Sequence, residues 1–164
     1  MAAVQAGGMA PNVSLSEMNG GRYVLQEALR RGPAVLAFFK ITCPVCQYAF
    51  PFLERIYRAH QGKVNIVGVS QSPRRETEFF VREYGISFPV LLDEPQHYAI
   101  SNSYGITNVP TIFLISEEGK VELCSVGWSR PDLEQINRRL AEAASMPEPE
   151  VFRRGEEVPE RTSG

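Results

Sequence analysis

Residues 34–46 read Ala34-Val-Leu-Ala-Phe-Phe-Lys-Ile-Thr-Cys-Pro-Val-Cys46. The first six residues are all apolar, which is typical of a strand that is covered on both faces of a sheet. A Cys-x-x-Cys pattern follows at once, and Pro44 suits the first turn of a helix, where its missing N–H costs little. Apolar residues then recur at helical spacing, so we expect a helix from Pro44 to about His60. The two cysteines therefore lie where a buried strand passes into a helix.

Strands and helices alternate through the rest of the chain. The sequence predicts strands over 63–69, 88–93, 111–115 and 121–126, and helices over 73–84, 96–104 and 131–144. Near the start, Asn19-Gly-Gly21 predicts a hairpin turn between two short strands. This order predicts an α/β fold in which a central mixed β-sheet is flanked by helices and preceded by a β-hairpin.

The 164 residues suggest one domain with some excess at its ends. Residues 1–11 are small and mildly apolar, and we expect them to form a flexible N-terminal segment. Residues 12–145 carry the domain. From residue 146 onward Pro, Glu and Arg dominate, so residues 146–164 are predicted to be disordered or loosely docked.

Composition excludes several classes of function. Hydrophobic residues make up 43% of the chain, enough to bury a core without disulfides. A net charge of −2 gives no reason to expect nucleic-acid or anionic-membrane binding. No apolar stretch approaches the roughly 18 residues of a transmembrane helix, and the start lacks the regions of a signal peptide. The sequence as it stands predicts a cytoplasmic monomer. If its N-terminus was trimmed, a periplasmic or membrane-tethered location is the alternative.

Cys43 and Cys46 are the candidate catalytic residues. Cys43 falls at the start of the predicted helix, where free backbone N–H groups and the helix dipole favour an anion such as a thiolate. Cys46 lies one turn further on, within reach of the Cys43 sulfur. We therefore expect Cys43 to form a mixed disulfide with a substrate and Cys46 to resolve it. The remaining cysteine, Cys124, falls in a predicted strand and is expected to be a small buried apolar residue.

Metal binding is an alternative use of a Cys-x-x-Cys pair. A zinc site usually needs four ligands, and only Cys124, His60 and His97 remain, none paired at ligand spacing. No metal or other cofactor is therefore predicted, although a metal-binding chaperone stays open as an alternative.

The chain resembles a known family. Phe38 to Cys46 and Val109-Pro-Thr111 are similar to the TlpA/ResA-like branch of the thioredoxin superfamily, in its redoxin or AhpC/TSA-like group. Phe88-Pro-Val-Leu-Leu-Asp93 resembles the inserted strand of that branch, and Ser103-Tyr-Gly-Ile106 resembles part of its C-terminal half. The resemblance covers roughly residues 10 to 144.

The resemblance implies a thioredoxin-like fold with an inserted strand–helix, and a dithiol that exchanges with protein disulfides or thiols. It also implies that Pro110 follows a cis peptide bond and lies against the cysteines. The backbone of Val109 would then pair with an extended substrate segment, next to Thr42, Pro44 and Val45. The implied partners are a protein with a disulfide or dithiol and a separate redox partner protein.

Three positions depart from the family pattern. Thr42 precedes the first cysteine where the family usually has Trp, and Pro-Val separates the cysteines where thioredoxin has Gly-Pro. Ala37 stands where thioredoxin carries a buried acid. Another group must then exchange a proton with Cys46, and Lys40 and Glu54 are the candidates.

A peroxiredoxin-like thiol peroxidase is the second alternative, because peroxiredoxins share the fold. Their usual Pro-x-x-x-Thr-x-x-Cys pattern is absent here. Aligned on Cys46, the Pro and Thr positions hold Phe39 and Cys43. The sequence therefore favours a thiol–disulfide oxidoreductase over a peroxidase.

Overall fold

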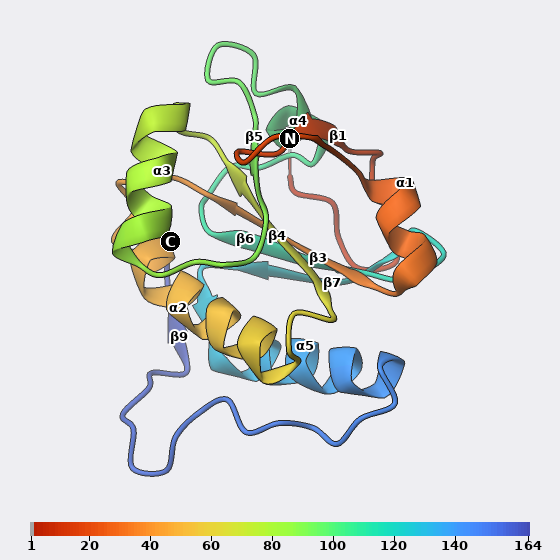
Figure 1. The fold of residues 1–164 in the computed structure, drawn as a ribbon, viewed down its shortest axis with the longest axis vertical. Coiled ribbons are helices and arrows are strands. Elements are labelled where there is room, and N and C mark those ends of the chain that lie inside the picture. The colour runs from red at the N-terminus through yellow and green to blue at the C-terminus, as the bar shows by residue number, and fades with distance from the viewer. Residues whose placement is uncertain (1) are drawn as a thin grey trace.

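The fold is seen in a computed structural model that describes residues 2–164. In this part of the chain the central sheet has five strands in the order β5-β4-β3-β6-β7. β3 (Ala34–Phe39), β4 (Asn65–Ser70) and β5 (Val90–Leu92) run parallel. β6 (Thr111–Ile115) runs antiparallel to β3, and β7 (Val121–Val126) runs antiparallel to β6. The sheet is therefore mixed, with β3 at its centre (Figure 1).

Every side chain of β3 is buried, as expected for the central strand of a sheet that is covered on both faces. Successive side chains of a strand point to opposite faces, so the strand contributes to two cores. Val35, Ala37 and Phe39 belong to one core, and Ala34, Leu36 and Phe38 belong to the other.

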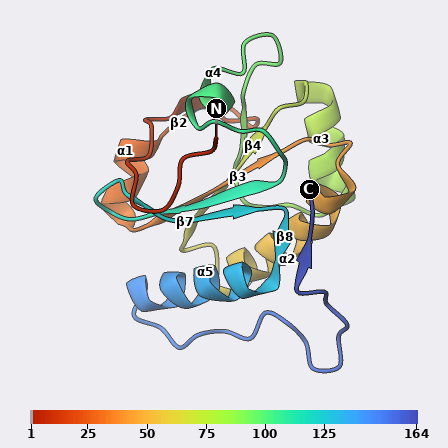
Figure 2. The same cartoon turned by 180° about the vertical axis from the view of Figure 1, so that it is seen from behind.

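Helices cover both faces of the sheet. α2 (Pro44–Ala59), α3 (Arg74–Glu83) and α5 (Arg130–Ala143) contribute to the first core. α1 (Leu25–Ala28), its 3₁₀ continuation η1 (Leu29–Arg31) and α4 (Ala99–Ser103) pack against the second. β1 (Ser14–Ser16) and β2 (Arg22–Val24) form the expected hairpin. The predicted α/β architecture is thus confirmed, and Figures 1 and 2 show α2 and α5 together on one side of the sheet.

α4 is shorter than the predicted helix over 96–104. The residue before it, Tyr98, has a left-handed backbone conformation with φ of 46°, which ends any continuous helix on that side. The Asp93 carboxylate accepts hydrogen bonds from the Ser101 N–H at 2.8 Å and the Ser101 hydroxyl at 2.7 Å. α4 therefore depends on a side chain at the end of β5 as well as on its own residues.

Residues 2–11 differ from the flexible segment that was expected. Gly7 N–H donates to the Val121 carbonyl at 2.8 Å, and Val121 N–H donates to the Gly8 carbonyl at 2.9 Å. β7 is an edge strand, and its free backbone groups offer partners to any extended neighbour. The segment is thus bound along the edge of the sheet, while residue 1 of the expected range lies outside the described residues.

The tail after residue 146 also makes specific contacts, unlike the disordered or loosely docked segment predicted from composition. It passes along α5 and α2 and returns as β9 (Arg161–Thr162) beside β8 (Trp128–Ser129), as Figure 2 shows. Val151 is buried in the first core, and Arg55 donates two hydrogen bonds of 2.8 Å to the Glu156 carboxylate. Composition is a poor guide here because a few well-placed contacts suffice to dock a polar segment. The domain limits at residues 12 and 145 stay a prediction.

Candidate active site

Cys43 lies at the carboxyl end of β3, at the N-cap position of α2. Its N–H donates to the Lys40 carbonyl at 3.3 Å, which closes the turn after the strand. Its Sγ accepts the Cys46 N–H at 3.3 Å. The sulfur thus occupies the place of an N-cap oxygen, which usually accepts a free N–H of the first helical turn.

Cys46 is fully buried one turn further on, whereas Cys43 is partly exposed. Burial, and then the hydrogen bond with the Cys43 side chain, raise the pKa of Cys46 well above its ordinary value, although a backbone hydrogen bond with Lys40 acts the other way. Cys46 is therefore a protonated thiol at neutral pH. Both side chains are free thiols. The two cysteines have unequal environments, with an accessible outer sulfur and a protected inner one.

The loop before β6 lies against Cys43, as the resemblance implied. The Val109–Pro110 peptide bond is cis. The Cys43 thiol donates to the Val109 carbonyl oxygen at 3.4 Å, across 66 positions of sequence. Gly127 N–H donates to the Pro110 carbonyl at 2.8 Å, and the Thr111 hydroxyl donates to the Asn108 carbonyl at 2.7 Å. These bonds hold the loop in place beside the sulfur.

The other expected substrate-binding residues surround Cys43. Thr42 and Pro44 are exposed, and Val45 is half-buried. Two further residues that sequence analysis missed fix the turn: Gln47 Nε2 donates to the Ile41 carbonyl at 2.9 Å, and Ile41 N–H donates to Ser72 Oγ at 3.2 Å. No sequence signal identifies Ser72, because its bond spans 31 positions, whereas the Gln47 bond is local to the turn and spans six.

Glu54 does not reach the cysteines, which corrects its assignment as a candidate for proton handling. It lies eight residues after Cys46, about 12 Å along the helix axis. Its buried carboxylate accepts the Ser87 N–H at 2.8 Å and the Ser87 hydroxyl at 2.5 Å, and pairs with Arg58 at 2.6 Å. Glu54 therefore joins α2 to the loop before β5. The side chain of Lys40 is exposed, and its backbone is the part that faces the site.

Replacing Glu54 with alanine should destabilise the fold. The change leaves the Ser87 N–H and hydroxyl without their buried acceptor, so we expect the free energy of unfolding to fall by about 1–3 kcal/mol. Urea unfolding measures this loss. Glu78→Ala on α3 is the matched control, because the Glu78 side chain is 43% exposed and lies 4.0 Å from its partner Arg74. It should cost less than about 0.5 kcal/mol. Equal stability of the two variants would contradict the structural role of Glu54.

Stability should also fall in alkaline solution because of Cys46. Its pKa is raised in the folded state, whereas an unfolded thiol titrates near 8.5. Above about pH 8.5 the unfolded chain therefore binds fewer protons than the folded one, and the free energy of unfolding falls by up to about 1.4 kcal/mol per pH unit. Urea unfolding between pH 7 and about 10 measures the slope, and Cys46→Ser should lack the contribution of this thiol. If the free energy of unfolding fell equally steeply with pH in both proteins, the raised pKa of Cys46 would be contradicted.

Cys124 is separated from this pair. It is half-buried in β7, opposite Phe113, and packs against the second core, whereas Cys46 lies in the first. Among residues 2–164, no three His, Cys, Asp or Glu side chains come close enough together to hold a metal ion. None of the helices in the same range is long and apolar enough to cross a membrane.

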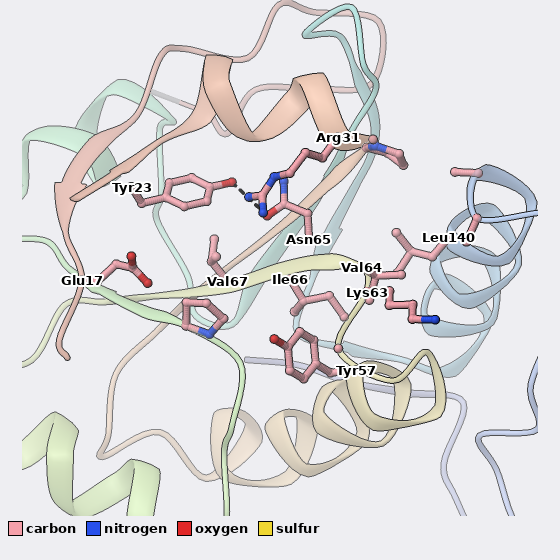
Figure 3. Close-up of a pocket in the computed structure, with 16 residues that line it drawn as sticks. Glu17, Tyr23, Arg31, Tyr57, Lys63, Val64, Asn65, Ile66, Val67 and Leu140 are labelled. Carbon is pink, nitrogen blue, oxygen red and sulfur yellow. Dashed lines mark hydrogen bonds between the residues drawn. The ribbon is translucent and has the colours of Figure 1, made fainter. Parts of the chain in front are cut away.

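A cavity of about 520 Å³, drawn in Figure 3, is lined by residues other than Cys43, Cys46 and Cys124. Tyr23, Tyr57, Lys63 and Asn65 are among the residues that line it, and the Tyr23 hydroxyl donates to Asn65 Oδ1 at 3.3 Å. Asn65 begins β4, so the cavity lies at the amino ends of the parallel strands, about 20 Å from their carboxyl ends. Open α/β sheets bind ligands at the carboxyl ends, which is where the cysteines are.

Comparison with known proteins agrees with the geometry. A sequence model of the AhpC/TSA family matches residues 6–124. The thiol-disulfide oxidoreductase ResA of Geobacillus thermodenitrificans is 30% identical over 136 residues, which are 81% of this chain and 76% of ResA.

Solved structures share the fold. The thioredoxin domain of a thiol-disulfide oxidoreductase from Bacteroides vulgatus has a TM-score of 0.74 and 20% identity, covering 84% of this chain and 99% of that one. The peroxidoxin BcpB of Mycobacterium tuberculosis has a TM-score of 0.70 and 19% identity, covering 88% and 99%. At these identities the two structures support the fold alone. Evidence for the chemistry has to come from the geometry of the cysteines.

Proposed function

Since the chain belongs to the AhpC/TSA family and is similar to ResA, we propose that Cys43 and Cys46 are the dithiol through which it exchanges disulfides with protein substrates. The chain is a thiol–disulfide oxidoreductase with a thioredoxin-like fold. One observation carries the assignment of residues: the Cys43 sulfur lies between the Cys46 N–H and the Val109 carbonyl. It therefore has a backbone N–H contact and, beside it, the backbone of Val109, along which a substrate segment would bind.

In the reducing direction, the Cys43 thiolate attacks one sulfur of a substrate disulfide. A Cys43–substrate bond forms, the substrate S–S bond breaks, and the second substrate sulfur leaves as a thiolate. Cys46 then attacks the Cys43 sulfur, which forms the Cys43–Cys46 disulfide and releases the other substrate sulfur. Two electrons pass from the protein dithiol to the substrate, and the reverse sequence oxidises a substrate dithiol.

The proton of Cys46 must leave before the second step, because only a thiolate attacks a disulfide. Its raised pKa makes this loss unfavourable at neutral pH. We assign the proton to the substrate thiolate released in the first step, since that group is formed beside the mixed disulfide. This route needs neither Lys40 nor Glu54.

An extended substrate segment would bind along the backbone of Val109, in the manner of an added strand. Thr42, Pro44 and Val45 would contact the substrate on the opposite side of Cys43, because they continue the turn into α2. The partners are then a protein with a disulfide or dithiol and a redox protein that restores the dithiol. A monomeric state remains part of this proposal, as does a cytoplasmic location, with a periplasmic or membrane-tethered location as the alternative.

Insulin reduction with dithiothreitol as electron donor tests the substrate class, and a parallel assay with hydrogen peroxide tests the peroxidase alternative. The proposal expects the protein to accelerate insulin reduction and to leave peroxide consumption close to that of dithiothreitol alone. Rapid peroxide consumption without insulin reduction would contradict it and support a thiol peroxidase.

A further inference from the structure

The last residues of the tail lie against the loop that faces Cys43. A Cβ placed on Gly164 would overlap the Val109 carbonyl oxygen and would lie 3.3 Å from Pro110 Cδ. This carbonyl is the one that accepts the Cys43 thiol hydrogen. The Val109 carbonyl oxygen is therefore in contact with the reactive sulfur and lies next to the end of the tail. Figures 1 and 2 both show the chain end beside the start of α2.

The tail reaches this position as an added strand. Thr162 pairs with Trp128 and Arg161 pairs with Ser129, antiparallel. Arg130 N–H donates to the Glu160 carbonyl at 2.8 Å, and bonded pairs alternate along an antiparallel ladder, so the Thr162–Trp128 pair is a hydrogen-bonded one.

Gly127, just before β8, leaves room for the tail. A Cβ on this residue would lie 2.5 Å from the Thr162 carbonyl and 3.0 Å from the Gly164 nitrogen. The tail backbone is thus in close contact with Gly127, which itself donates to the Pro110 carbonyl at 2.8 Å.

Two parts of the tail are held differently. Upstream, Val151 is buried, Glu156 is bound by Arg55, and the Trp128 indole N–H donates to the Pro159 carbonyl at 2.6 Å. The side chains of residues 161–164 are exposed. The segment contacts the β8 backbone, Gly127 and the Val109–Pro110 loop, and Arg161 donates a 3.1 Å bond to Ser129 Oγ. The last four residues can therefore leave while the upstream anchors keep the tail attached.

We propose that residues 161–164 compete with the substrate for the backbone of Val109–Pro110 and Gly127–Ser129. An extended polypeptide segment, bound through its backbone, displaces them when it forms the mixed disulfide with Cys43. The inference rests on the proposed function, because that function brings such a segment to Val109. The apparent affinity for the substrate is then reduced in proportion to the fraction of molecules in which the tail has left this backbone.

Thr162→Pro tests the competition in the 164-residue chain. It removes the N–H of a ladder pair at an exposed position, so it should release the tail from Val109–Pro110 without disturbing the core. We expect kcat/KM for insulin to rise by about 3–10-fold, whereas the rate with hydroxyethyl disulfide, which carries no peptide strand, stays within about twofold. Thr162→Val keeps the N–H and is the matched control. A Thr162→Pro value equal to or below that of the control would overturn the proposal.

Hydrogen exchange provides a test that does not require turnover. A Cys46→Ser variant is joined through Cys43 either to an extended cysteine peptide or to mercaptoethanol, each supplied as an activated disulfide. The amides of residues 161–164 should exchange faster with the peptide attached and keep their protection with mercaptoethanol. Unchanged protection in the peptide adduct would refute the competition. Loss of insulin reduction in the unaltered chain would instead refute the proposed function, so the two failures are distinguishable.

Discussion

Replacing Cys43 with serine should lower kcat/KM for insulin reduction by at least roughly 10³-fold. A serine hydroxyl is not ionised at neutral pH and cannot form the mixed disulfide, so the first step of the exchange is lost. The N-cap position tolerates serine well, and the fold should therefore remain intact. Insulin reduction and a urea unfolding curve on the same sample measure the two properties.

Cys124→Ser is the control for that experiment. Cys124 packs against the core on the opposite face of the sheet from Cys46, so the control should stay within about twofold of the unaltered chain, as expected for independent sites. If Cys43→Ser kept most of its activity while Cys124→Ser lost it, the reactive sulfur would have been assigned to the wrong residue.

Replacing Cys46 with serine should separate the two steps. Cys43 can still attack a substrate disulfide, but the mixed disulfide has no internal thiol to resolve it. We expect turnover to fall by at least roughly 100-fold and a covalent complex with the substrate to accumulate. Mass spectrometry under non-reducing conditions detects that complex.

The complex should be sensitive to dithiothreitol and should be missing from the Cys43→Ser variant. Full turnover by Cys46→Ser would contradict the role of the buried cysteine. It would show that an external thiol resolves the intermediate, as in a one-cysteine mechanism.

Local sequence patterns predicted most of the fold. The apolar residues 34–39 had to be covered on both faces, and they form the central strand with both cores beside it. The Cys-x-x-Cys between that strand and a helix start placed Cys43 at the N-cap of α2. The cis Val109–Pro110 bond and its position beside Cys43 came from the family resemblance, since nothing in the local sequence distinguishes this proline from one in an ordinary turn.

Features that depend on tertiary partners could not be predicted in this way. In the sequence Glu54 looks like a charged surface residue of a helix. It is buried, and its carboxylate accepts the Ser87 N–H, only because the loop that holds Ser87 packs against α2. Likewise, the tail has the composition of a disordered segment. Its contact with Arg55 spans 101 positions of sequence and its pairing with β8 spans about thirty, and single-sequence patterns carry no information about such pairs.

The most direct test of the central claim is a redox titration of the unaltered chain in glutathione buffers, read by alkylation and mass spectrometry. The account predicts one two-electron transition in which the protein loses about 2 Da as the Cys43–Cys46 disulfide forms. Cys124 should remain alkylatable once the protein is unfolded in the alkylation step. Oxidation that linked Cys124 to either of the other cysteines, or a chain in which Cys43 and Cys46 stayed separately alkylatable at every potential, would contradict it.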